Sequence, residues 1–207
     1  MFARCWRWCC CCSRQRRGGH YEYMLDGRGT VDKYFKLALI GGRAGKTTLR
    51  HGFANKECQE ADSSALIADA GCSVREMDIA GEPVNIHIFE FSADEANQSS
   101  ARASATRSLL LADGIFLVYD VTCRNSLELL KNTMLNAEVL GHLCRATHVL
   151  VVGAKNDAEG DKKRVSAQEG KAFADKIGAG FVETSGREGK NVSKALFLMM
   201  VTLSESR

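Results

Sequence analysis

The stretch "FKLALIGGRAGKTTL" (residues 35–49) decides the fold that the sequence predicts. Its first half is a nearly continuous apolar run, which is typical of a strand buried on both faces of a parallel sheet. Three glycines follow, and the run "KTTLRHGFAN" (residues 46–55) predicts a helix that opens on the glycine turn. A strand, a glycine turn and a helix in this order predict an α/β unit with a loop at the carboxyl end of the strand.

The glycine turn departs by one residue from the phosphate-binding loop motif. That motif requires Gly, four residues of any kind, and then Gly-Lys-Ser/Thr. Counting back from Gly45, Lys46 and Thr47 puts Ile40 at the first position, and Gly41 stands one residue too close. Three interpretations are open at this point: a working nucleotide site, a relic of one, or a chance run of small residues.

The rest of the chain alternates strands with helices. Two runs flank a turn at residues 80–83 and predict a hairpin, and three more apolar runs predict buried strands. A capping box at Ser166 and Glu169, with a stop at Gly178, marks one of three further helices. The expected strands are 34–40, 72–79, 84–91, 114–120, 148–154 and 180–185, and the further helices are 125–140, 166–178 and 191–205. This order predicts a three-layer α/β fold with a mostly parallel, six-stranded sheet and one antiparallel hairpin.

Composition divides the chain into an extension and a body. With 207 residues and 45% hydrophobic side chains, the chain can bury the core of one domain. The first 21 residues carry five arginines and no acid, and without them 23 basic side chains face 25 acidic ones, a balance of −2. A near-neutral body argues against nucleic acid as a partner. We therefore expect a basic, Cys- and Trp-rich extension and linker (1–33), one domain (34–203) and a short tail (204–207).

The cysteines of the body stand singly, at positions 58, 72, 123 and 144. Single cysteines without paired spacings are typical of reduced side chains in an intracellular protein. No apolar run approaches the roughly 20 residues that a membrane-spanning helix needs. The body is therefore expected to fold without disulfides and without a spanning helix.

Side chains suited to nucleotide chemistry follow the expected strands. Backbone N–H groups of the glycine turn can surround phosphate oxygens, Lys46 can reach the β and γ phosphates, and the Thr47 hydroxyl can ligate Mg²⁺. Asp157, after the strand at 148–154, can accept both N–H donors of the guanine edge, a pair that adenine does not offer. After the last strand, a backbone N–H near Ser185 and Gly186 can meet the guanine O6. These groups meet at one edge if the strands are parallel.

These segments, in this order, resemble the small GTPases of the Ras superfamily, and the Rab branch most closely. "FKLALIG", "IFLVYDVT" with "NSLELL", and "KAFADKIGAGFVETS" are similar to Rab segments, and the resemblance covers residues 34–203. It implies the G domain of P-loop NTPases, with GTP or GDP and Mg²⁺ as ligands. The implied phosphate-binding residues are Gly41, Gly42, Arg43, Ala44, Gly45, Lys46, Thr47 and Thr48, and the implied guanine-binding residues are Lys155, Asp157, Ser185 and Gly186.

The chain departs from the Rab pattern mainly around the γ phosphate. Its loop has three residues before Gly45 where Rab proteins have four. At the second switch, Rab proteins have Asp-x-x-Gly-Gln, and the corresponding residues here run from Glu90 to Asp94. Thr47 and Glu90 are the candidate Mg²⁺ ligands. Asp94 stands in place of the glutamine that orients the attacking water, and its negative charge disfavours attack on a phosphate, so no catalytic residue is assigned.

Two further departures affect the metal and the base. The Mg²⁺-binding threonine of the first switch has no clear counterpart, because Ile67 aligns there and Ser63 and Ser64 are the nearest hydroxyls. Ala154 replaces the asparagine that braces the base-binding loop in Rab proteins. Together the departures predict that nucleotide hydrolysis is affected more than nucleotide binding.

The amino-terminal segment "MFARCWRWCCCCSRQRR" combines thiols, both tryptophans and only basic charge. Rab proteins usually end in prenylated cysteines, whereas this chain ends "TLSESR". Acylated thiols beside Trp and Arg supply the two signals that stable membrane attachment needs. We expect palmitate on Cys9, Cys10, Cys11 and Cys12. A mitochondrial targeting peptide and an inert extension are the alternatives, while contiguous cysteines lack the paired spacing of zinc sites.

The sequence therefore predicts a Rab-like small GTP-binding protein with weak or absent GTP hydrolysis. The expected location is the cytoplasmic face of an intracellular or plasma membrane, with mitochondria as the alternative. There the protein would act as a switch or recruiter in vesicle-mediated transport, through effector and regulator proteins. Two other functions stay open: a nucleotide-free pseudo-GTPase that serves as an interaction module, and a competent GTPase.

Overall fold

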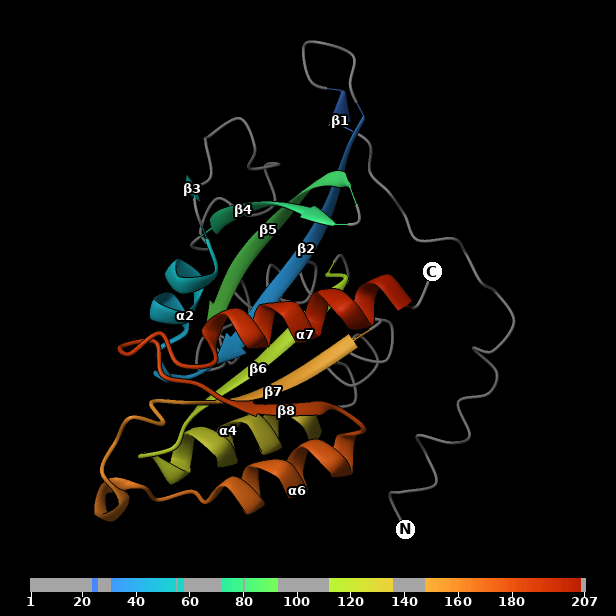
Figure 1. The fold of residues 1–207 in the computed structure, drawn as a ribbon. Helices are drawn as coiled ribbons and strands as arrows, with labels where there is room; N and C mark the ends of the chain where they lie inside the picture. Colours follow the sequence, from blue (N-terminus) through green and yellow to red (C-terminus); the bar gives the residue numbers. More distant parts are fainter. Residues whose placement is uncertain are drawn as a thin grey trace, which may run out of the picture.

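The computed structural model describes residues 24–25, 31–54, 56–57, 72–79, 81–92, 112–135 and 148–205. Within them, one mixed sheet lies between two pairs of helices (Figure 1). The strands are β1 (Met24–Leu25), β2 (Val31–Gly41), β3 (Lys56–Glu57), β4 (Cys72–Ile79), β5 (Glu82–Ser92), β6 (Gly114–Asp120), β7 (His148–Ala154) and β8 (Gly180–Glu183). The α-helices are α2 (Lys46–Phe53), α4 (Arg124–Leu135), α6 (Ala167–Ile177) and α7 (Val192–Glu205), and a short 3₁₀ helix covers Gly160–Lys162.

The sheet has the order β3-β4-β5-β2-β6-β7-β8, and β1 pairs with β2. Strands β5, β2, β6, β7 and β8 are parallel to their neighbours in this group, while β4 is antiparallel to β5. With the two-residue strands β1 and β3 set aside, this is the mostly parallel, six-stranded sheet with one hairpin that the sequence predicts. The α/β fold class is therefore confirmed.

The register of the sheet brings the carboxyl ends of its parallel strands to one edge. Gly41 of β2 pairs with Ser92 of β5, and Asp120 of β6 pairs with Ala154 of β7. The segments that follow β2, β6, β7 and β8 therefore emerge beside one another. This edge is where side chains for a ligand can gather.

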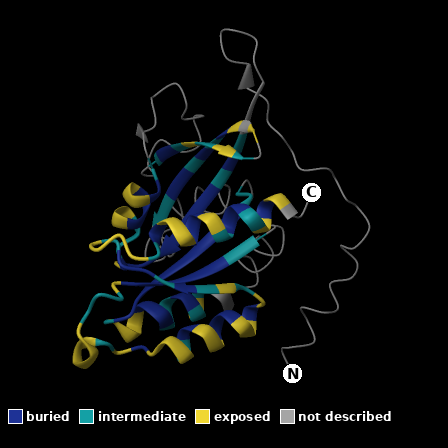
Figure 2. Cartoon of the chain, viewed as in Figure 1, coloured by how far each residue is buried: buried dark blue, intermediate teal, exposed yellow. Residues whose placement is uncertain are grey.

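Two buried clusters hold the layers together, one on each face of the sheet. Helices α2 and α7 pack on one face, through side chains such as Phe53 and Met199. Helices α4 and α6 pack on the other, through side chains such as Leu130 and Phe173. All seven residues of β6 are buried, as expected for a central strand covered on both faces. Figure 2 shows the buried strands between helices whose outer faces are exposed.

The local signals around α6 are confirmed in detail. The Ser166 hydroxyl accepts from the backbone N–H of Glu169, and the Glu169 carboxylate accepts from the backbone N–H of Ser166. Gly178 ends the helix at φ 68°, in the left-handed region that favours glycine. These reciprocal contacts satisfy backbone groups that the ends of a helix leave unpaired.

The structure differs from the expectations in two places. The segment interpreted as linker contributes β1 and the first residues of β2, because β1 pairs with Val31 and Asp32, and β5 pairs with β2 from Lys33 onward. Cys72 is disulfide-bonded, so the expectation that the single cysteines are all reduced is wrong for this residue. Within the described residues, no helix is long and apolar enough to cross a membrane.

Candidate functional site

The glycine loop joins β2 to α2 in a compact turn of residues 42–45. A Cβ on Gly41 would lie 2.1 Å from the Val118 carbonyl oxygen, so β2 and β6 leave room only for glycine there. Ala44 is fully buried, and its N–H donates to the Gly42 carbonyl at 2.8 Å. Gly45 has φ 82°, and helix α2 begins at the next residue. The short loop therefore forms a tight turn in which the Ala44 side chain is buried in the core.

Lys46 turns back over this loop. Its ammonium donates to the Gly41 carbonyl at 2.8 Å and to the Gly42 carbonyl at 2.7 Å. The charge is thus held at the start of α2, where the helix dipole also favours an anion. This arrangement suits a phosphate group lying over the loop.

Thr47, Glu90 and Arg50 form a polar corner beside the loop. The Thr47 hydroxyl lies 2.8 Å and 3.1 Å from the two carboxylate oxygens of Glu90. The Arg50 Nε atom lies 3.7 Å from the same carboxylate. Hydroxyl and carboxylate oxygens are ligands that Mg²⁺ prefers, so Thr47 as a direct ligand and Glu90 through water fit this ion. Among the described residues, no three His, Cys, Asp or Glu side chains gather as a metal cluster.

On the opposite side of the loop, Lys155 pairs with Asp120. The Lys155 ammonium lies 2.6 Å from Asp120 Oδ2, with the carboxylate buried and the lysine half-exposed. Burial raises the pKa of Asp120, but hydrogen bonds from Lys155 and Thr122 outweigh it and hold that pKa below its ordinary value. Lys155 has φ 63°, and a Cβ on Gly45 would lie 3.8 Å from its side chain. Lys155 therefore links the base side of the site to the phosphate side.

Asp157 and Ser185 form a second pair at the ends of β7 and β8. The nearby Ser185 side chain, the residue's own backbone N–H and the charges of Arg187 and Lys155 lower the pKa of Asp157. The buried Ser185 hydroxyl also accepts from the Glu188 N–H at 3.0 Å. Asp157 is thus an ionised acceptor at the wall of the site.

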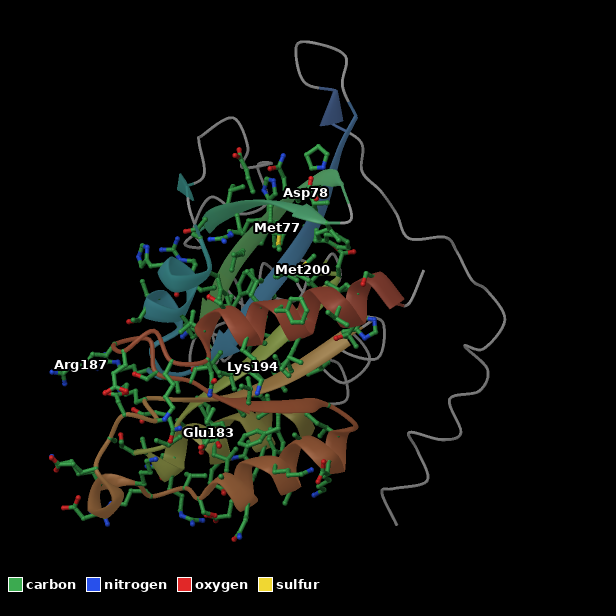
Figure 3. The ribbon with its side chains drawn as sticks, viewed as in Figure 1. Met77, Asp78, Glu183, Arg187, Lys194 and Met200 are labelled. Carbon is green, nitrogen blue, oxygen red and sulfur yellow. The ribbon has the colours of Figure 1, made fainter. Side chains whose placement is uncertain are left out.

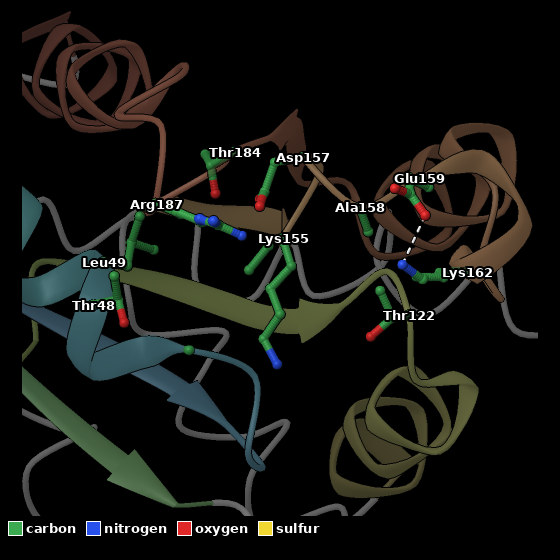
Figure 4. A pocket seen from close by; sticks show the side chains of 13 residues that line it. Thr48, Leu49, Thr122, Lys155, Asp157, Ala158, Glu159, Lys162, Thr184 and Arg187 are labelled. Carbon is green, nitrogen blue, oxygen red and sulfur yellow. Dashed lines mark hydrogen bonds and ion pairs between the residues drawn. The ribbon is translucent and has the colours of Figure 1, made fainter.

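A cavity of about 470 Å³ lies between these groups (Figure 4). Gly45 and Thr48 line it from the phosphate side, and Lys155, Asp157 and Gly186 line it from the base side. The volume lies within the range of pockets for small ligands, which is roughly 300–1,000 Å³. The structure thus brings residues from both predicted groups, phosphate-binding and guanine-binding, to the wall of one cavity.

Gly186 packs against the start of α2. A Cβ there would lie 2.7 Å from Thr48 Cγ2, so the loop after β8 approaches the helix closely. Arg187, the next residue, also lines the cavity, and Figure 3 shows it projecting from this edge of the domain. The loop after β8 therefore borders the cavity on one side, and Thr122, which follows β6, borders it on the other.

Thr184 is a wall residue that the sequence interpretation missed. It is 1% exposed, and its hydroxyl has no hydrogen-bond partner within the described part of the chain. Ala154, at the end of the neighbouring strand, offers only a methyl group where the Rab pattern has an amide. In Figure 4, the Thr184 hydroxyl and the Asp157 carboxylate point the same way. The only sequence signal for this residue is the loss of the asparagine at Ala154.

Arg50 and Asp120 were also missed, and each had a weak signal. Arg50 stands beside Leu49 in a short helix, and its burial depends on a contact with β4 that the sequence does not reveal. Asp120 ends the apolar run "GIFLVYD". A charged residue at this position indicates where the strand ends, but not which side chain it pairs with. Several predicted groups lie outside the described residues: Asp94, the switch residues Ser63, Ser64 and Ile67, and the thiols Cys9 to Cys12.

The sheet order and the glycine loop between β2 and α2 define the class: an α/β P-loop GTPase domain. The family model "Ras family" matches residues 36–205, and the chain belongs to this family. It is 32% identical over 173 residues to Ras-related protein Rab-8B of Homo sapiens and of Pongo abelii, and to Ras-related protein Rab-8A of Gallus gallus. Each alignment covers 82% of this chain and 78% of the relative. The chain is thus a Rab-like small GTPase of the Ras superfamily.

Proposed function

We propose that this chain binds GDP and GTP in the cavity between α2 and the loops after β7 and β8, and hydrolyses GTP slowly or not at all. The observation that carries the proposal is that Gly45 of the glycine loop, next to Lys46, lines one cavity together with Lys155 and Asp157. A lysine held over a glycine loop suits phosphates, and an ionised acceptor at the far wall suits a base with two adjacent donors.

Recognition of guanine is assigned to Asp157, Lys155, Ser185 and Gly186. The Asp157 carboxylate accepts only, so it favours the N1–H and N2–H₂ edge of guanine over adenine. The Ser185 side chain helps to keep this carboxylate ionised. The Lys155 stem covers the wall beside Gly45, where a base or ribose would lie. Adenine nucleotides are therefore expected to bind much more weakly.

Recognition of phosphates is assigned to residues 41–48, with Lys46 as the main charge. Mg²⁺, when bound beside Thr47 and Glu90, would neutralise phosphate charge. Slow hydrolysis is inferred from the sequence, because Asp94 stands where an amide would hold the attacking water. The shortened loop has the same consequence, since it offers fewer N–H groups to the γ phosphate.

For the cellular role, we propose a switch or recruiter at the cytoplasmic face of an intracellular or plasma membrane, in membrane or vesicle traffic. Support comes from the Rab relatives and from the basic, Cys-rich segment at the start of the chain. Partners would be effector and regulator proteins that bind the Rab-like framework. Replacing Cys9 to Cys12 with Ser tests the anchor: the protein should move from the membrane to the soluble fraction, and unchanged membrane binding would rule out acylation there.

A second candidate is a nucleotide-free interaction module. It is favoured by one observation: the Lys46 ammonium donates to two carbonyls of its own loop, so its charge has partners within the protein. The Lys155 ammonium likewise has Asp120 as its partner. Both candidates share the framework and differ only in whether the cavity is filled.

Denaturing the purified protein and assaying the released nucleotide separates the two candidates. Stoichiometric GDP or GTP supports the proposed function, and its absence after refilling attempts with both guanine nucleotides supports the interaction module. A competent GTPase would instead show Mg²⁺-dependent phosphate release that falls in Lys46→Ala. Equal release from this variant and from the exposed control Lys176→Ala would indicate a contaminating enzyme.

A further inference from the structure

Thr184 places a buried hydroxyl in the wall of the proposed nucleotide cavity. The residue is 1% exposed, and its hydroxyl has no hydrogen-bond partner among the residues that the structure describes. The oxygen is also closed to solvent, so water does not offset the cost of leaving it unpaired. A buried polar group in this state points to a partner that the described residues do not supply.

Two backbone hydrogen bonds hold Thr184 in this wall. Its N–H donates to the Gly153 carbonyl at 2.8 Å, and its carbonyl accepts from the Asn156 N–H at 3.0 Å. These partners stand on either side of Ala154, which lines the same cavity with a methyl group. The Thr184 backbone is therefore held in place, and rotation about χ1 is the movement that brings the hydroxyl to a partner.

The location of Thr184 distinguishes it from another buried hydroxyl, that of Tyr119. The Tyr119 hydroxyl likewise has no hydrogen-bond partner in the described part of the chain. It lies between β7 and α6, where a Cβ on Gly153 or on Gly170 would lie 2.8 Å or 2.1 Å from it, and Tyr119 does not line the cavity. Thr184 lines the cavity with Asp157, and in Figure 4 its hydroxyl and the Asp157 carboxylate point the same way. The Thr184 hydroxyl therefore belongs to the base side of the site.

The chemistry of guanine leaves one atom for this hydroxyl. In the proposed function, Asp157 accepts from the N1–H and N2–H₂ edge, and a backbone N–H near Gly186 meets O6. The acceptor that remains beside O6 is N7. A threonine hydroxyl can donate as well as accept, so it suits this atom, either directly or through one water.

We infer that Thr184 is a further base-contacting residue, whose hydroxyl donates to guanine N7 when the nucleotide is bound. The inference rests on the proposed function, because it concerns the same cavity and the same base. The hydroxyl gains its hydrogen bond only in the complex, so the contact favours nucleotide binding without stabilising the free protein. Thr184 thereby adds a third point of contact to the base, after Asp157 and the loop at Gly186.

The test compares GDP with 7-deaza-GDP, in which a C–H group replaces N7, by calorimetric titration of the nucleotide-stripped full chain. The wild type should bind 7-deaza-GDP about three- to tenfold more weakly than GDP, as expected for one hydrogen bond. Thr184→Val keeps the shape of the side chain and should bind both nucleotides with the same, weaker affinity. Thr184→Ser keeps a hydroxyl and should regain most of the preference for GDP. The ratio of the two affinities isolates the contact, because other effects of a substitution act on both ligands.

Tyr119→Phe is the matched control, because it removes a buried hydroxyl that has no partner among the described residues and lies outside the cavity wall. Its preference for GDP over 7-deaza-GDP should equal that of the wild type. Thr184→Ala serves the same comparison if Thr184→Val does not fold. Equal binding of the two nucleotides by the wild type, or an unchanged preference in a folded Thr184→Val or Thr184→Ala, would overturn this inference alone. Failure of the wild type to bind either nucleotide would overturn the proposed function with it.

Discussion

Thr184 and Ser185 are adjacent buried hydroxyl residues with opposite hydrogen-bonding states. The Ser185 hydroxyl accepts from the Glu188 N–H, whereas the Thr184 hydroxyl has no partner among the described residues. An unsatisfied buried hydroxyl costs free energy, and a satisfied one contributes to stability.

Replacing each hydroxyl should therefore have opposite results in the nucleotide-free protein. Thr184→Val should leave the free energy of unfolding unchanged or raise it by up to about 1 kcal/mol, since it removes an unpaired polar group. Ser185→Ala should lower it by about 1–3 kcal/mol, because it leaves the Glu188 N–H without an acceptor. Urea unfolding measures both values. A large loss of stability in Thr184→Val would mean that its hydroxyl has a partner.

The pair of Asp120 and Lys155 predicts a dependence of stability on pH. The pKa of Asp120 is lowered in the folded protein, so the unfolded chain takes up this proton at a higher pH. The stabilising contribution is complete above the unfolded value of about 3.9 and is lost as pH falls through the lowered folded value. The contribution of Lys155 is modest, because its side chain is half-exposed.

Lys155→Met tests this pair. At about pH 7 the variant should be less stable than the wild type by about 1 kcal/mol. The difference should shrink below about pH 4, where protonation of Asp120 removes the attraction in the wild type as well. Denaturant unfolding at several pH values measures it. A difference that stays constant with pH would show that Lys155 acts by packing rather than by charge.

At the scale of elements, the glycine loop is the part in which sequence and geometry are most closely linked. With one residue fewer than the Rab pattern, the turn buries Gly42 and Ala44 and leaves Arg43 exposed and Gly45 half-buried. Inserting one glycine after Gly42 should restore an additional backbone donor without moving the buried alanine. A hydrogen bond to a charged group contributes about 1.5–3 kcal/mol.

The insertion should therefore tighten GTP binding by about tenfold or more and favour GTP over GDP, because the added donor lies nearest the γ phosphate. Competition titrations with both nucleotides measure the ratio. The melting temperature of the nucleotide-free insertion variant serves as the control for folding. Weaker GTP binding in a folded variant would mean that the short loop is already matched to its ligand.

Most of the elements could be predicted because their signals are local. Apolar runs of about seven residues predicted β6 and β7, and the capping box with Gly178 predicted α6 to within a residue. The extension of β2 could not be predicted, since residues 31–32 pair with β1 and Lys33 pairs with β5, and a single valine before Asp32 and Lys33 carries little strand signal. The full length of β2 therefore follows from its pairing with neighbouring strands, which the β-propensity of its own residues does not reveal.

The same distinction holds at the site. The shared edge of Lys46, Lys155 and Asp157 could be predicted from their places after strands, because parallel strands bring their carboxyl ends to one edge. The contacts of Arg50 with β4 and of Asp120 with Lys155 could not, since each joins residues far apart in the chain. Such pairs depend on the strand order rather than on a motif.

For the whole molecule, the framework of a Rab-like protein is retained while the groups around the γ phosphate are altered. The sheet, the two helix layers and the cavity are present, and the base side keeps Asp157, Lys155 and Ser185. The phosphate side has a shortened loop, a glutamate at position 90 and an arginine beside it. This pattern is consistent with a protein that holds a guanine nucleotide and signals by recruitment more than by turnover.

The most direct test is a calorimetric titration of nucleotide-stripped protein with GDP and with ADP, in the wild type and in Asp157→Ala. The wild type should bind GDP with a Kd of about 1 μM or tighter and ADP at least about a hundredfold more weakly. Asp157→Ala should lose most of this preference, because Asp157 accepts the donors that only guanine has. Equal binding of GDP and ADP by the wild type, or no heat of binding with either, would contradict the account.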